Sequence, residues 1–326
     1  MTHFSSVLQL GTLSLKSRFL LAPLESVSDA AFRRLAWELG AGLTFTEMIR
    51  AQGVARKNRS TIDLIDTIDR EVPTGIQLMT TGSDELKSAL SHIEDFAYST
   101  HSHLQNICAI DLNFGCPSPQ IIRAGGGPAL LKRRSKLREI FTTLNEFKAS
   151  TRLPIRAIGA KIRLGLNRAE QDQKIYLAVA DIANESLDYL TVHARHGRSS
   201  SEDRAVWSAI AEVKARSSIP VIGNGDILQA TDAKSMYQQS NCDGFLIARG
   251  AIRSPWIFRG LTAQGIDAPE SIQEIDALEE RYVALSHQYT TKSKFRSWHA
   301  EGFQRMRDRF LGINRPSEPL PTNENL

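Results

Sequence analysis

The stretch Asp111-Leu-Asn-Phe-Gly-Cys-Pro-Ser-Pro119 places one thiol where it could take part in chemistry. The apolar residues 108–112 predict a short buried strand, and Gly115 permits a tight turn at its end. The two prolines of the stretch then stiffen the segment after the turn. Cys116 would therefore stand on a fixed loop at the C-terminal end of a strand. The alternative is a small buried cysteine that fills the turn, since free cysteine is among the most buried residue types.

Polar side chains also follow other short apolar runs, at the places where those runs end. They are Gln77, Asn113, Lys161, Arg163, His193, Arg195, Asn224, Asp226 and Arg249. Each one alone has a structural explanation, because a buried amide can satisfy backbone groups and a single histidine is often simply packed. Their recurrence at six strand ends favours one shared site.

Eight short runs rich in Val, Ile, Leu and Phe predict the strands that would position these side chains, at residues 19–22, 43–45, 75–79, 109–113, 157–162, 189–193, 220–224 and 244–248. Segments with helical periodicity separate most of them, at residues 29–39 (capped by Ser28 or Asp29), 83–98, 135–147, 169–185, 207–215 and 231–239. Eight strand–helix units over about 250 residues predict an α/β fold, a (β/α)8 TIM barrel, with its chemistry at the C-terminal strand ends. An open doubly wound sheet is the alternative, because alternation alone does not establish closure.

The last two predicted strands are followed by glycine-containing loops, Gly223-Asn-Gly225 and Arg249-Gly250. In TIM barrels a phosphate group often binds after strands seven and eight. Backbone N–H groups freed by glycine, with a guanidinium nearby, would hold a monophosphate through charge-assisted hydrogen bonds. Neither a Rossmann fingerprint nor a Walker loop is present in the sequence. A mononucleotide is therefore expected rather than a dinucleotide.

The composition fits one barrel-sized domain with a small appendage, or two ordinary domains, since 326 residues with 41% hydrophobic content can bury a large core. Three cysteines are too few for a disulfide framework and lack metal-ligand spacing, so we expect a cytoplasmic protein without a metal. No signal segment is evident, and no apolar run approaches the roughly 18 residues of a spanning helix. We expect no membrane partner and a monomer.

Positive charge is concentrated in two segments, although the net charge is only +4. Residues 121–168 hold 12 Lys or Arg against two Glu, and residues 281–315 hold 8 against one Glu and one Asp. Such segregation is typical of proteins that bind a polyanion such as RNA or DNA, while a solvated helix face is the alternative. The second segment overlaps two predicted helices, 272–290 and 294–311, and a weakly ordered tail from Asn314. We predict a barrel domain at 1–262 and a small helical domain at 263–326.

Seven motifs in order along the chain resemble those of the tRNA-dihydrouridine synthases. They are Leu21-Ala-Pro-Leu-Glu25, Asn113-Phe-Gly-Cys-Pro117, Gly125-Gly-Gly127 with Leu130-Leu131, Lys161-Ile-Arg163, Val192-His-Ala-Arg195, Asn224-Gly-Asp226 and Arg249-Gly-Ala251. The resemblance runs from about Phe19 to Phe258, and it is closest to the bacterial C-type branch. It implies an FMN-binding barrel followed by a helical domain that binds tRNA.

The resemblance also implies a reaction and the residues that perform it. Reduced FMN, replenished by NADPH, would deliver hydride to C6 of a uracil, and Cys116 would donate the proton at C5. An ordinary thiol, with a pKa of about 8.5, is mostly protonated at neutral pH and suits this task. The flavin would contact Pro23, Leu24, Glu25, Gln77, Lys161, His193, Asn224, Gly225, Asp226, Ala248, Arg249 and Gly250. The uracil would contact Asn113, Lys161, Arg163 and Arg195.

Four positions depart from the family pattern. Leu24 replaces a Met, Ser26 stands where the family usually has Gly, and Pro119 and Ile122 replace polar or basic residues. These departures affect the loops expected near the substrate, not the thiol or the phosphate site. Two other functions remain open at this point: a dihydroorotate dehydrogenase-like FMN barrel, which the basic segments disfavour, and a non-catalytic RNA-binding barrel, which the polar strand ends disfavour.

Overall fold

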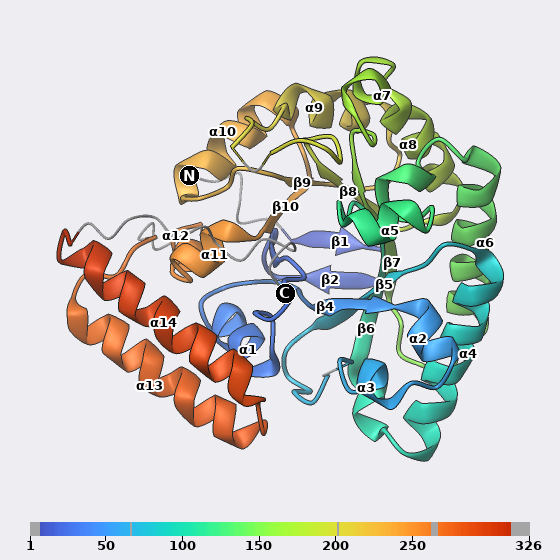
Figure 1. Ribbon diagram of the computed structural model, residues 1–326. Coiled ribbons are helices and arrows are strands. Elements are labelled where there is room, and N and C mark those ends of the chain that lie inside the picture. Colours follow the sequence, from blue (N-terminus) through green and yellow to red (C-terminus); the bar gives the residue numbers. More distant parts are fainter. Residues whose placement is uncertain (1–6, 66, 201, 262–266, 314–326) are drawn as a thin grey trace.

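The computed structural model describes residues 7–65, 67–200, 202–261 and 267–313, and its centre is one eight-stranded parallel sheet (Figure 1). The strands are β3 (Phe19–Leu21), β4 (Thr44–Arg50), β5 (Thr74–Met79), β6 (Ile107–Phe114), β7 (Ala157–Arg163), β8 (Tyr189–His193), β9 (Val221–Asn224) and β10 (Gly244–Ile247). A parallel bridge between Leu20 and Leu43 joins the two ends of the sheet, and the Leu21 N–H donates to Leu43 O at 2.9 Å. The sheet is therefore closed. The predicted barrel is confirmed, and the open-sheet alternative is wrong.

Helices surround the barrel and cover the outward faces of its strands (Figure 1). They are α1 (Ala30–Glu38), α2 (Ala51–Ala55), α3 (Arg59–Ile62), α4 (Ser83–Ser99), α5 (Pro119–Arg123), α6 (Arg134–Ser150), α7 (Arg168–Asp172), α8 (Ile175–Ser186), α9 (Trp207–Arg216), α10 (Ala230–Ser240), α11 (Arg249–Arg253) and α12 (Ile257–Gly260). Asp29 caps α1, since its Oδ1 accepts from the Phe32 N–H at 2.7 Å. The single helix predicted at 169–185 is wrong: Lys174 adopts a left-handed φ of 54° and separates α7 from α8.

A two-stranded hairpin that the sequence did not predict closes the N-terminal end of the barrel. Its strands, β1 (Leu8–Leu10) and β2 (Leu13–Leu15), are antiparallel and lie across the middle of the ring in Figure 1. Each strand alternates buried leucine with an exposed polar residue. The four leucines belong to one buried cluster with the apolar side chains inside the barrel, so the hairpin acts as a plug.

Alternate residues of each strand point into the barrel, and their character changes along the strand. Toward the N-terminal ends they are mostly apolar and pack with the hairpin leucines: Leu20, Phe45, Ala109, Ala157, Tyr189, Ile222 and Leu246. Two or four residues later on the same faces come Gln77, Asp111, Asn113, Lys161, His193 and Asn224. The strand pattern therefore places the polar groups together at the C-terminal end of the barrel.

Two helices, α13 (Ile272–Gln288) and α14 (Ser293–Phe310), follow the barrel and pack side by side against α1 (Figure 1). The Tyr282 hydroxyl donates to Asp29 Oδ2 at 2.7 Å, and His299 Nε2 lies 3.0 Å from Val27 O. The two predicted C-terminal helices are thus present. The predicted boundary between residues 262 and 263 and the tail from Asn314 lie outside the described residues. Within the described part of the chain, no helix combines the length and apolarity needed to cross a membrane.

Candidate active site at the mouth of the barrel

Two adjoining cavities open at the C-terminal ends of the strands. The inner one has a volume of about 220 Å³ and the outer one about 880 Å³, and they share the lining residues Pro117, Arg163, His193, Asn224 and Ala248. The inner cavity is also lined by Pro23, Leu24, Glu25, Gln77, Asn113, Cys116 and Lys161, and the outer one by Arg195, Gly225, Asp226 and Arg249. The barrel therefore brings nearly all the predicted site residues to one opening, whose size is usual for a ligand site.

Gly250 is not among the residues that line either of the two cavities. A Cβ at this position would approach Ile227 O to 2.4 Å, so only glycine lets α11 pack this closely on the loop after β9. Gly250 thus supports the neighbouring Arg249, and a direct contact between Gly250 and a flavin stays a prediction.

The Cys116 loop is held from two sides. Asn113 Oδ1 accepts from the backbone N–H groups of Gly115 and Cys116, both at 2.9 Å. On the other side, Gly127 has a left-handed φ of 55°, and a Cβ there would lie 2.6 Å from Cys116 O. Cys116 is 5% exposed and belongs to a small apolar cluster with Met79 and Ile121. The thiol thus occupies a fixed and largely buried place in the wall of the inner cavity.

A chain of side-chain hydrogen bonds continues from Asn113 into the barrel. Asn113 Nδ2 donates to Gln77 Oε1 at 2.6 Å, and Gln77 Nε2 donates to Asp111 Oδ2 at 2.7 Å. Burial raises the pKa of Asp111 to about 6. Sequence reasoning missed Asp111 as a site residue. The signal was present, because Asp111 lies two residues before Asn113 on the same strand and must point to the same side.

Two cations lie next to the thiol on β7. Burial, and then the charge of Arg163, lower the pKa of Lys161 to about 8, while Asp111 and Cys116 act in the opposite direction. Arg163 donates to Gly115 O at 2.8 Å and to His196 O at 3.0 Å. Its pKa falls to about 10, mainly through burial. Both side chains therefore carry positive charge at neutral pH.

His193 is held neutral. Burial lowers its pKa well below the usual value, and the charges of Arg163, Lys161, Arg195 and Arg249 lower it further. Its Nε2 lies 3.4 Å from Arg195 Nη1, which can only donate. Nε2 is then the acceptor and Nδ1 carries the proton, so His193 can donate one hydrogen bond without carrying a charge.

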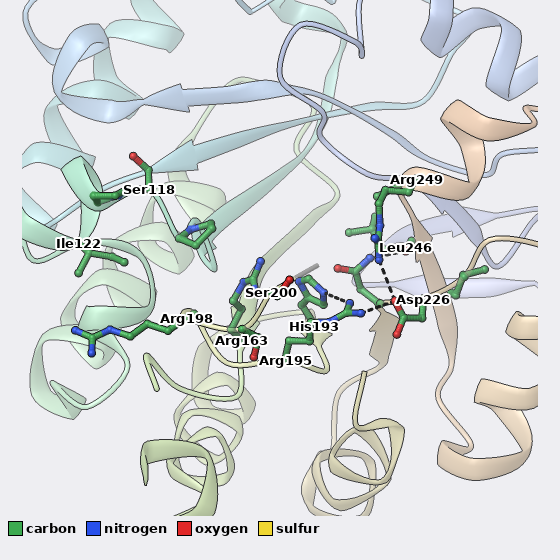
Figure 2. A pocket seen from close by; sticks show the side chains of 18 of the residues that line it. Ser118, Ile122, Arg163, His193, Arg195, Arg198, Ser200, Asp226, Leu246 and Arg249 are labelled. Atoms are coloured by element: carbon green, nitrogen blue, oxygen red, sulfur yellow. Dashed lines mark hydrogen bonds and ion pairs between the residues drawn. The ribbon is translucent and has the colours of Figure 1, made fainter. Parts of the chain in front are cut away.

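An ion-pair network lines the outer cavity on the side of β9 and β10 (Figure 2). Asp226 Oδ1 lies 2.6 Å from Arg195 Nη2 and 2.9 Å from Arg249 Nη2, so one carboxylate faces two guanidinium groups. Gly225, with φ of 116°, brings the backbone against the His193 ring; a Cβ there would lie 3.1 Å from His193 Cδ2. The network has an excess of positive charge beside a glycine-containing turn, and such a place suits an anionic group.

Further lining residues were not expected from the sequence. Arg123 and Arg198 are exposed at the rim of the outer cavity, and Met48 lines the inner one. Met48 was missed because β4 runs to Arg50, five residues beyond the predicted strand end. Of the four departures, Pro119 and Ile122 line the outer cavity and Leu24 the inner one. Ser26 is buried, with its N–H donating to Glu47, and contributes to neither wall as described.

Comparison with known proteins gives concordant matches. The family model described as "Dihydrouridine synthase (Dus)" matches residues 20–311. A protein from Aquifex aeolicus named "Probable tRNA-dihydrouridine synthase" is 31% identical over 75% of this chain and 72% of its own length. A protein of the same name from Rickettsia conorii is 28% identical over 98% of this chain and 95% of its own.

Solved structures show the same fold at low sequence identity. A histamine dehydrogenase from Rhizobium sp. 4-9 has a TM-score of 0.60 and 14% identity over 87% of this chain, which spans about half (51%) of that protein. A morphinone reductase variant has a TM-score of 0.52 and 13% identity over 82% of this chain and 92% of its own.

Proposed function

The chain belongs to the dihydrouridine synthase family, and from that premise we propose that it is an FMN-dependent tRNA-dihydrouridine synthase that uses NADPH as reductant. The proposed reaction adds hydrogen across the C5–C6 bond of a uridine in tRNA. One observation carries the proposal: a thiol, two cations and a neutral imidazole, from Cys116, Lys161, Arg163 and His193, line one cavity at the mouth of the barrel. The protein is proposed to act in the cytoplasm as a monomer.

The residues around the two cavities fit FMN. The ion-pair network of Arg195, Asp226 and Arg249 with the turn at Gly225 offers an excess positive charge that would hold the phosphate. Residues proposed to hold the ring system are Pro23, Leu24, Glu25, Gln77, Lys161, His193, Asn224 and Ala248, all of which line the inner cavity. When bound, FMN supplies the hydride chemistry that side chains cannot perform. The charge of Lys161 would favour electron-rich oxygen or nitrogen atoms of the ring.

The proposed role of Cys116 is to donate a proton to C5 of the uracil. Its loop is fixed by Asn113 and Gly127, so the sulfur does not have to be ordered when the substrate binds. Arg163 and Lys161 would stabilise negative charge on the uracil carbonyl oxygens as it develops. Asn113 and Arg195 are also proposed to contact the base. The burial of the thiol would strengthen these electrostatic interactions.

The proposed macromolecular partner is tRNA. A uridine must leave its stack to reach a cavity of this kind. Arg123 and Arg198 stand exposed at the rim, where they could contact phosphates beside the extruded base. The helices after residue 263 are proposed to be a second RNA-binding part. Fewer of their positive side chains can contact RNA than the number of Lys and Arg in the sequence indicates. Arg281 pairs with Glu38, and Arg307 pairs with Asp276 and Glu279.

The contribution of the rim is tested by the salt dependence of tRNA affinity. Because phosphate contacts release counterions, affinity should fall steeply with salt, and Arg123→Gln or Arg198→Gln should each reduce the slope by about 1. Arg138→Gln, on the barrel side and paired with Glu185, is the matched control and should leave the slope unchanged. Equal slopes for all four proteins would contradict the proposed rim contacts.

The direct test of function is mass analysis of tRNA nucleosides after incubation with the FMN-loaded protein and NADPH. The expected product is a nucleoside two mass units heavier than uridine, absent when NADPH is omitted. Oxidation of dihydroorotate by the same preparation is the parallel assay. Flavin reduction by dihydroorotate without change in tRNA would replace the proposed substrate by a small pyrimidine, and a protein unable to bind FMN would support the non-catalytic alternative.

A further inference from the structure

The hydrogen-bond chain inside the barrel has a direction that is fixed at both of its ends. At one end, the ionised Asp111 carboxylate can only accept, so Gln77 must present its NH2 group to it. At the other end, the backbone N–H groups of Gly115 and Cys116 can only donate, so Asn113 must present its carbonyl oxygen to them. The remaining amide groups, Asn113 NH2 and Gln77 C=O, then match each other at 2.6 Å.

We propose that Asp111 is a positioning residue, which sets the orientation of the Gln77 and Asn113 amides and thereby holds the Cys116 loop in its place at the cavity wall. Its importance for catalysis rests on the proposed function of Cys116. Asp111 is not itself among the residues that line the inner cavity, and it acts on the loop through two intervening side chains, Gln77 and Asn113.

Burial allows this series of side-chain hydrogen bonds to fix the orientation of the two amides. Asp111 is 2%, Gln77 1% and Asn113 9% exposed, so water has little access to replace a lost partner. A flipped Gln77 amide would set its oxygen against the Asp111 carboxylate and its NH2 against the Asn113 NH2. Both contacts are repulsive, and a buried amide has no water molecule that could take the place of the lost hydrogen-bond partner. The carboxylate therefore excludes the reversed orientation rather than merely disfavouring it slightly.

Asp111 has two properties that one pair of substitutions can separate. It is an acceptor for Gln77, and its charge also raises the pKa of the neighbouring Lys161. Asp111→Asn keeps a carbonyl oxygen for Gln77 but removes the charge. Asp111→Leu removes both. If the acceptor positions the loop, only the leucine variant should release it.

The experiment is residue-resolved hydrogen exchange of the Gly115 and Cys116 amides in the flavin-loaded protein. We expect exchange at least tenfold faster than wild type in Asp111→Leu and within threefold of wild type in Asp111→Asn. Gln77→Leu breaks the chain at its centre, leaves Asp111 in place and should match Asp111→Leu; it serves if the latter does not fold. Thr191→Val changes another buried, inward-facing polar residue that takes no part in these hydrogen bonds, and its amide exchange should match that of the wild type.

Several outcomes would overturn the proposal. Unchanged exchange in Asp111→Leu and Gln77→Leu would show that the loop does not depend on the chain. Equally fast exchange in Asp111→Asn and Asp111→Leu would assign the effect to charge and not to the acceptor. Dihydrouridine formation is measured in parallel, with the asparagine variant expected to retain more activity than the leucine variant. Failure of the wild type to form dihydrouridine would contradict the proposed function but not the positioning role of Asp111, since hydrogen exchange is measured without any substrate.

Discussion

The two ends of the barrel are built from the same strands, but the inward-facing side chains are apolar at one end and polar or charged at the other. At the N-terminal end, inward-facing side chains such as Ala157, Tyr189 and Ile222 pack with the leucines of the β1–β2 hairpin and leave no opening among the cavities described. At the C-terminal end, the same faces carry Lys161 and His193, which are half-buried and line a cavity. Along β7 and β8, the change from an apolar to a polar inward-facing side chain takes only four residues.

This difference shows how the fold separates stability from chemistry. Burying apolar area at the closed end contributes favourable free energy of about 25 cal/mol per Å². Burial at the open end has an opposing cost, visible in the lowered pKa of Lys161 and the raised pKa of Asp111. Substitutions at the closed end should therefore change stability and those at the open end should change function.

The largest expected effect is at the closed end. Leu10→Ala removes a fully buried side chain from the plug and should lower the free energy of unfolding by about 2–5 kcal/mol. Turnover per folded molecule should stay as in the wild type. Leu24→Ala, which is half-buried in the wall of the inner cavity, should show the opposite pattern, with weaker FMN binding and a smaller loss of stability. Denaturant titration and FMN titration of both variants make the comparison, and similar profiles for the two would contradict it.

A pair of lysines offers the matching test of function. Lys161→Met removes a cation from the cavity and should reduce dihydrouridine formation by about 10²–10³-fold, the usual cost of losing one such electrostatic contact. Lys214→Met removes a cation near the closed end, where Lys214 pairs with Asp243 at 2.7 Å. That half-exposed pair should contribute no more than about 1 kcal/mol to stability and nothing to turnover. An equal loss of turnover in both variants would contradict the claim that only the open end of the barrel contributes to the reaction.

A smaller effect is expected from pH. Lys161, with a pKa of about 8, is charged below pH 8 and loses its charge above it, so FMN affinity should be full below pH 8 and fall by up to about tenfold per pH unit above it. Asp111→Asn removes a charge that raises this pKa and should move the midpoint to lower pH. Lys161→Met should bind FMN weakly with no such midpoint. A midpoint unchanged in Asp111→Asn would mean that another group titrates.

Sequence patterns predicted the strands well because fully buried parallel strands read as apolar runs, and all eight runs became strands. Closure could not be read, since it depends on contacts such as Leu20 with Leu43 between distant strand ends. The hairpin was missed because each of its strands holds only two leucines around one polar residue, whereas β3, which is equally short, is a continuous apolar run. The break at Lys174 was missed because both sides of it continue a helical periodicity.

The candidate site was predictable to the extent that polar residues end apolar strands. That rule found Lys161 and His193, and the loop with Gly115 found Cys116, all of which line the inner cavity. It did not find Asp111, since a carboxylate inside an apolar run gives no sign of what it bonds to. The orientation of the amides, and the pKa shifts that burial causes, depend on neighbours from several strands and appear only in three dimensions.

The central claim is that the thiol of Cys116, at the open end, protonates the substrate, while the thiol of Cys108, which packs with the hairpin leucines near the closed end, does not. The most direct measurement is a single turnover of pre-reduced, FMN-loaded enzyme with tRNA under anaerobic conditions, comparing Cys116→Ala with Cys108→Ala. The two cysteines are equally buried, at 5% exposure, so burial alone does not separate them. We predict dihydrouridine formation at least a hundredfold slower in Cys116→Ala, with FMN content unchanged, and a wild-type rate per folded molecule in Cys108→Ala. Equal rates for the two variants would contradict the account.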